Sequence, residues 1–104
     1  MSFRRYEITL PTRYNDGTPV EAEKFEATYE DLVAKFDALS EQPDKLYRIS
    51  VREGEHLEES NVRFRVDVED STENYNFFSQ YKRALMQRFR QTDIWIVSYE
   101  TPIT

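Results

Sequence analysis

The stretch Asn61-Val62-Arg63-Phe64-Arg65-Val66-Asp67-Val68-Glu69 alternates polar and apolar residues without a break. Successive side chains of a strand point to opposite faces of a sheet, so this alternation predicts a strand with one buried face and one exposed face. Its buried side would carry valine and phenylalanine, and its exposed side carries only Asn61 and charged residues. A sheet built from such strands needs cover on one face only.

Outward from this stretch, three other segments read as strands. Residues 3–10 and 46–52 alternate in the same way, and residues 94–99 form the last apolar segment. The segment between 52 and 61 is polar and contains Gly54, which predicts a hairpin that joins two neighbouring strands. The inward side chains expected on these three strands are Tyr6, Ile8, Tyr47, Ile49, Val51, Ile94 and Ile96.

Two segments read as amphipathic helices, because their apolar residues recur at helical spacing. The first is expected over residues 18–40, with Thr18 as cap, Pro19 at the first helical position and Glu21 completing a capping box. The second begins after Asp70 or Ser71 as cap and carries Arg88 and Arg90 in its last turn. The apolar faces are Phe25, Tyr29, Leu32, Phe36 and Leu39 in the first helix, and Phe78, Tyr81, Leu85 and Phe89 in the second.

The order strand-helix-strand-strand-helix-strand over 104 residues predicts one domain, residues 1–104. Short, right-handed connections favour an α+β, ferredoxin-like two-layer sandwich. The expected sheet is antiparallel and four-stranded, in the order 4-1-3-2, with both helices on one face.

Composition narrows the possible functions. The net charge of −6 works against nonspecific binding to nucleic acid or anionic lipid. The chain has no cysteine, which removes disulfides and thiolate sites and fits a cytoplasmic protein. The N-terminus shows no signal-peptide pattern, and the longest apolar run, residues 94–97, is far too short for a membrane span. No cofactor is expected.

The uncovered sheet face is the most informative feature, because it should hold five arginines, three carboxylates and an aromatic strand. Three interpretations fit this face: a single-strand nucleic-acid platform, a ladder of cross-strand ion pairs, and a dimer interface. We favour the ion-pair ladder over nucleic acid, and among binding functions we favour the dimer interface. The candidate binding residues are Arg5, Arg48, Arg63, Arg65, Trp95 and Tyr99, and their expected neighbours are Glu7, Arg52, Asp67, Glu69 and Val97.

Two loops carry residue types that can form binding sites. His56 stands among four carboxylates in residues 53–59, but the spacing matches no zinc or calcium motif, so a solvated loop without metal is expected. The turn Tyr14-Asn15-Asp16-Gly17 precedes a helix N-terminus, where anions can bind, but a plain turn is favoured.

Catalysis is not favoured. A single histidine leaves no room for a convincing nucleophilic triad. The alternative of a small-ligand or metal-dependent enzyme would use a carboxylate near Asp16 or Glu7.

Both ends of the chain carry a resemblance. The turn Tyr14-Asn15-Asp16-Gly17 with the acidic helix after it, and the segment Phe89-Arg90-Gln91-x-x-Ile94-Trp95-Ile96, resemble a family of short, uncharacterised conserved bacterial proteins. The chain departs from the family pattern at residues 41–46, because the family has a longer stretch with glycine and tryptophan before the hairpin. The resemblance implies no activity. We therefore expect a non-enzymatic binding protein that forms a homodimer or contacts a protein partner, with single-stranded nucleic acid as the alternative ligand.

Overall fold

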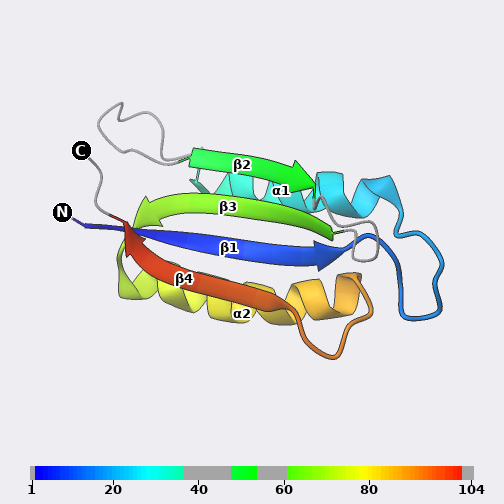
Figure 1. Ribbon diagram of the computed structural model, residues 1–104. Coiled ribbons are helices and arrows are strands. Elements are labelled where there is room, and N and C mark those ends of the chain that lie inside the picture. The colour runs from blue at the N-terminus through cyan, green and yellow to red at the C-terminus, as the bar shows by residue number, and fades with distance from the viewer. Residues whose placement is uncertain (1, 37–47, 54–60, 102–104) are drawn as a thin grey trace.

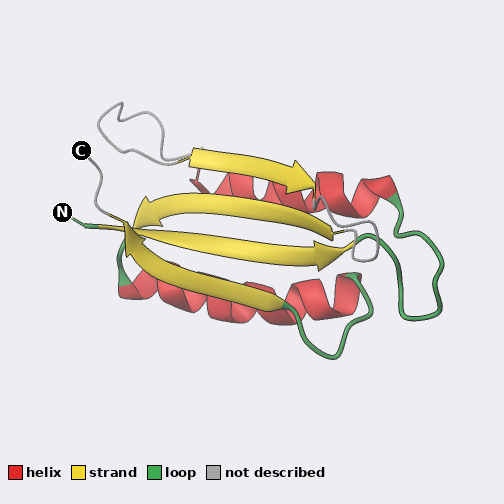
Figure 2. Ribbon diagram, viewed as in Figure 1, coloured by secondary structure: helices red, strands yellow, loops and turns green. Residues whose placement is uncertain are grey.

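The computed structural model describes residues 2–36, 48–53 and 61–101, with the backbone alone for 48–53 (Figure 1). The elements in these residues follow the order β1, α1, β2, β3, α2 and β4. Their bounds are β1 Phe3–Pro11, α1 Ala22–Phe36, β2 Arg48–Glu53, β3 Asn61–Glu69, α2 Thr72–Arg88 and β4 Trp95–Thr101. Both helices lie behind the same face of the sheet, and no helix of the described residues covers the other face (Figure 2).

The strands pair antiparallel in the spatial order β2-β3-β1-β4. β1 is central, with Ile8 opposite Phe64 of β3 on one side and opposite Ile96 of β4 on the other. Because directly opposite residues point to the same face, the apolar positions of these strands meet on the helix side. The strand predicted over residues 61–69 and its pairing with the segment before the hairpin are confirmed.

The expected four-stranded ferredoxin-like sandwich is corrected at one edge, where β2 pairs with only part of β3. The continuous part of the sheet has three antiparallel strands, in the order β3-β1-β4, which pair along most of their length. β2 joins β3 through six backbone pairs, from Arg48 opposite Asp67 to Glu53 opposite Val62, whereas β1 pairs with β3 along all nine of its residues. A short edge strand with one neighbour has fewer ladder hydrogen bonds to hold it. We therefore describe the fold as a two-helix α+β domain.

The core fills the space between the sheet and the two helices. Tyr6 of β1 stacks on Phe78 of α2 with ring centroids 3.9 Å apart, and Phe36 of α1 stacks on the same Phe78 at 5.6 Å. Leu32 and Leu85, one from each helix, are fully buried. Each such side chain stabilises the fold by roughly 1.5–3 kcal/mol relative to exposure. Tyr29 was expected in this core but is half exposed.

The start of α1 was predicted incorrectly. The Thr18 hydroxyl donates to Asp16 Oδ1 instead of capping a helix, and Pro19 forms an isolated bridge with Arg13. The helix begins only at Ala22, because the turn holds the chain in an extended path up to Val20. The expected end near residue 40 lies outside the described residues.

The limits of α2 agree with the sequence more closely. Ser71 caps the helix and accepts from the backbone N–H of Asn74 at 3.1 Å, as predicted. Arg90 does not lie in the last turn, because it adopts a left-handed backbone (φ 52°) just beyond the helix. β4 begins at Trp95, one residue later than expected, and Ile94 is buried before it.

Candidate functional site

The face of the sheet without helices, called here the open face, lies toward the viewer in Figure 1. Three rows of its residues cross all four strands. Tyr99, Arg5, Asp67 and Arg48 form one row. Val97, Glu7, Arg65 and Ser50 form the next, and Trp95, Thr9, Arg63 and Arg52 form the third.

The first row is organised by a bidentate ion pair. Arg5 Nε and Nη2 donate to the two carboxylate oxygens of Asp67 at 2.7 and 3.0 Å. Asp67 is almost fully buried, although it belongs to the open face. The hydrogen bond to Asp67 raises the pKa of Arg5, burial opposes this, and the neighbouring Tyr99 adds to the rise. Arg5 is therefore a fixed cation whose charge is already matched.

A second ion pair crosses the next row. Arg65 Nε donates to Glu7 Oε1 at 3.1 Å, and the Tyr99 hydroxyl donates to the same oxygen at 3.0 Å. Glu7 thus links β3, β1 and β4. The two pairs together show that the ion-pair ladder is present on the central strands.

The ion-pair ladder limits which ligands the open face can bind. A phosphate backbone needs cations that can turn toward it, and Arg5 and Arg65 are both held by carboxylates. Arg63 is exposed, and none of the side chains that the structure describes forms an ion pair with it. The side chains of Arg48 and Arg52 lie outside the described part.

Two aromatic residues of the open face, Trp95 and Tyr99, lie on β4 at the edge of the sheet, and the register places a third, Phe3, on β1. Trp95, Val97 and Tyr99 are 72%, 47% and 43% exposed, and they point to one side because they alternate along the strand. We call these three residues the apolar strip. Such a run of exposed apolar side chains is typical of contact surfaces rather than of free surface.

Polar side chains of the turn before α1 are hydrogen-bonded to neighbouring residues. The side chain of Tyr14 is buried and its hydroxyl donates to Glu21, while the Lys24 ammonium donates to that hydroxyl. The Arg90 guanidinium lies over the Tyr14 ring, 4.6 Å from its centroid.

Asp16 is engaged in the same way. Its carboxylate accepts from the Thr18 hydroxyl at 2.6 Å and from the Thr18 N–H at 2.9 Å, and these bonds lower its pKa. Gly17 takes a φ of +88°, which few other residues tolerate. Asn15 is exposed and donates no side-chain hydrogen bond to the described residues. The polar groups of Tyr14 and Asp16 are thus bonded within the turn and to Glu21 and Lys24.

The loop that contains His56 lies outside the described residues. Among those that are described, no group of three or more histidine, aspartate or glutamate side chains could hold a metal ion.

Sequence reasoning missed a polar cluster between the two helices. Asp31 of α1 accepts from the Tyr81 hydroxyl at 2.9 Å and from Arg88 Nη2 at 2.8 Å, both on α2. Arg88 Nη1 also donates to the buried Thr28 hydroxyl at 2.9 Å. Tyr81 and Arg88 stand seven residues apart, hence on one helix face, and this spacing is the signal that could have revealed the pair.

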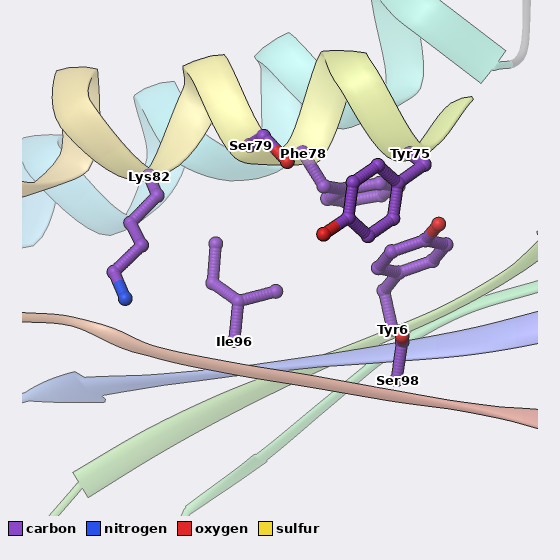
Figure 3. A pocket seen from close by; sticks show the side chains of 7 residues that line it. All are labelled: Tyr6, Tyr75, Phe78, Ser79, Lys82, Ile96 and Ser98. Atoms are coloured by element: carbon purple, nitrogen blue, oxygen red, sulfur yellow. The ribbon is translucent and has the colours of Figure 1, made fainter. Parts of the chain in front are cut away.

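A groove of about 250 Å³ between α2 and β4 was also missed (Figure 3). Lys82 reaches from α2 toward β4, and Ile96 points from β4 toward the helix. The Tyr75 and Tyr6 rings close the other end. The Tyr6 hydroxyl is buried and has no hydrogen-bond partner among the described residues.

Comparison with known proteins finds no relative. No protein-family model matches the chain, and searches of curated proteins and of solved structures return no match. The resemblance to short bacterial proteins therefore stays a prediction, and the ferredoxin-like name is not carried further. In the described part of the chain, neither helix is long and apolar enough to cross a membrane.

Proposed function

We propose that this chain is a small, non-enzymatic interaction protein that forms a homodimer through the open face or its edge strand β4, with the apolar strip at the contact. The observation that carries the proposal is the exposure of Trp95 beside Val97 and Tyr99 on one edge strand. Tryptophan, tyrosine and arginine are the residues most enriched at protein interfaces. The proposal keeps the cytoplasmic location expected from the sequence.

The ion pairs support a protein partner rather than a nucleic acid. Arg5 and Arg65 are already neutralised, so covering them does not bury unpaired charge. A single strand of nucleic acid would gain little from these two cations, and Trp95 and Tyr99 stand at the edge instead of on the central strands. The carboxylates of Glu7 and Asp16 are likewise engaged, which weighs against a catalytic role for either.

Light scattering on purified protein tests the proposal. Wild type should show twice the protomer mass of 12.5 kDa at high micromolar concentration. Trp95→Ala should weaken the dimer by at least about tenfold, because a buried tryptophan anchor is typically worth roughly 2 kcal/mol. Trp95 is the single tryptophan, so its fluorescence should also shift as the protein is diluted.

The matched control is Tyr29→Ala, which removes an exposed aromatic from α1, away from the sheet. This variant should keep the wild-type mass. A wild type that remains a monomer at high micromolar concentration contradicts the proposal. Tight binding of short oligonucleotides at physiological salt would favour the nucleic-acid alternative instead.

A further inference from the structure

The two edges of the sheet differ in how well they are protected. An edge strand exposes unpaired N–H and C=O groups and pairs with other chains unless charges, proline or a bulge prevent this. Three of the six residues of β2 are charged, whereas Glu100 is the single charge among the seven residues of β4. In the described part of the chain, β4 has β1 as its one neighbour. β4 is therefore the edge open to pairing.

We propose that two copies of this chain pair β4 against β4, antiparallel, so that the two sheets become one. This inference rests on the proposed self-association and specifies its geometry. A two-fold axis places one residue opposite itself in the partner. Ser98 is the middle residue of Trp95–Thr101, so an axis at Ser98 gives the longest overlap of the two strands.

On the open face, this register joins the two apolar strips. Residues directly opposite share a face, so Val97 meets the partner's Tyr99 and Trp95 meets the partner's Thr101. A pair of aromatic and β-branched side chains is favourable in this position. The apolar strip of each copy therefore contacts the partner's strand, and the same contacts repeat on the other side of the axis.

On the helix side, the same register brings opposite charges together. Ile96 lies opposite the partner's Glu100, about 4.8 Å away across the ladder. Lys82 reaches down beside Ile96 in the groove between α2 and β4 (Figure 3). The partner's Glu100 therefore enters the groove next to the Lys82 ammonium.

Lys82 and Glu100 can each form one more ion pair. The Glu100 side chain is 71% exposed, and its one ion pair with a described residue is a distant one to Arg4, 3.9 Å away. Lys82 binds Asp93 at 2.9 Å, but an ammonium has three donors and can accept a second carboxylate. Packing of two open faces against each other would leave this groove unused, so the Lys82–Glu100 contact distinguishes strand pairing from face packing.

A charge exchange tests the contact. Lys82→Glu and Glu100→Lys should each raise the dimer dissociation constant about tenfold, since two opposite-charge contacts become two repulsive ones. The double variant Lys82→Glu/Glu100→Lys should return to within about threefold of wild type, because the attraction is restored with reversed sign. Arg83→Glu is the matched control: it makes the same charge change at an exposed neighbour on α2 and should leave the constant unchanged.

Cysteine crosslinking tests the register. The chain has no cysteine, so a single introduced thiol reports one position. Ser98→Cys should form a covalent dimer on mild oxidation, because it faces itself across the axis. Thr101→Cys should not, since two copies of that position lie six residues apart along the strand, roughly 20 Å.

These experiments distinguish the strand pairing from self-association by another surface. A wild-type dimer without a Ser98→Cys crosslink, or a double charge variant that is not rescued, overturns the strand pairing and leaves the proposed self-association standing. A wild type that is monomeric overturns both.

Discussion

Two buried tyrosines in this domain have opposite hydrogen-bonding states. Tyr81 of α2 is 8% exposed, and its hydroxyl donates to Asp31 and lies 3.4 Å from Arg88 Nη1, which donates to it. Tyr6 of β1 is 2% exposed, and its hydroxyl has no partner among the described residues. Burial raises the pKa of both phenols above 10.0.

The two hydroxyls therefore have opposite effects on the free energy of unfolding. A buried hydroxyl that is left without a partner costs roughly 1–3 kcal/mol, whereas a satisfied one contributes about 1 kcal/mol. The Tyr81 cluster connects the two helices, and Tyr6 lines the groove beside β4. The helix pair is thus a scaffold, and the unsatisfied group lines the groove beside β4, the strand on which we place the partner.

The largest effect is expected when the satisfied cluster loses its acceptor. Asp31→Ala removes the carboxylate that accepts from Tyr81 and Arg88, and should lower the free energy of unfolding by about 2 kcal/mol. Chemical denaturation measures this. Glu30→Ala, an exposed neighbour of the same charge on α1, is the control and should change stability by less than about 0.5 kcal/mol. Equal losses in the two variants would mean that the cluster is not a stabilising unit.

A smaller loss is expected when the hydroxyl alone is removed. Tyr81→Phe keeps the ring packing against Phe77 and should cost about 1 kcal/mol, because Asp31 and Arg88 still bind each other. The same denaturation experiment applies, with the half-exposed Tyr29→Phe as control. A Tyr81→Phe variant as stable as wild type would remove the contrast between the two tyrosines.

The sequence alone predicted well which face of the sheet each strand residue occupies, because alternation reports on this directly. Arg5, Glu7, Arg65 and Asp67 were all assigned to the open face, and cross-strand ion pairing was anticipated there. Strand periodicity is local, so these assignments needed no knowledge of distant contacts.

The sequence could not show the contacts that form between residues far apart in the chain. Asp31 and Arg88 are 57 residues apart, so Asp31 reads as a solvent-facing residue until the two helices pack. Thr18 looked like a cap because the competing acceptor, Asp16, belongs to a turn whose geometry is set by Gly17. The state of the Tyr6 hydroxyl depends on every neighbour around it, and a pattern of apolar positions carries no information on that.

Alkaline pH provides a finer measure of the same contrast. The unfolded chain loses its phenolic protons near pH 10.0, whereas folded Tyr81 keeps its proton because burial, and then its bond to Asp31, raise its pKa. Its contribution is therefore complete below that pH and declines as the pH rises further, by at most about 1.4 kcal/mol per pH unit. Denaturation just above pH 10 should show a shallower decline for Tyr81→Phe than for wild type. Parallel curves for the two proteins would contradict the raised pKa.

The smallest change, and the one of opposite sign, is expected at Tyr6. Tyr6→Phe keeps the stacking on Phe78 and removes a hydroxyl without a partner, so stability should stay unchanged or rise by up to about 1 kcal/mol. Denaturation compared with the exposed Tyr75→Phe across the groove gives the measurement. A loss as large as that of Tyr81→Phe would show that the Tyr6 hydroxyl does have a partner in solution. If that loss appeared only at concentrations where the protein is dimeric, the partner strand would be its source, since stabilisation by association depends on protomer concentration.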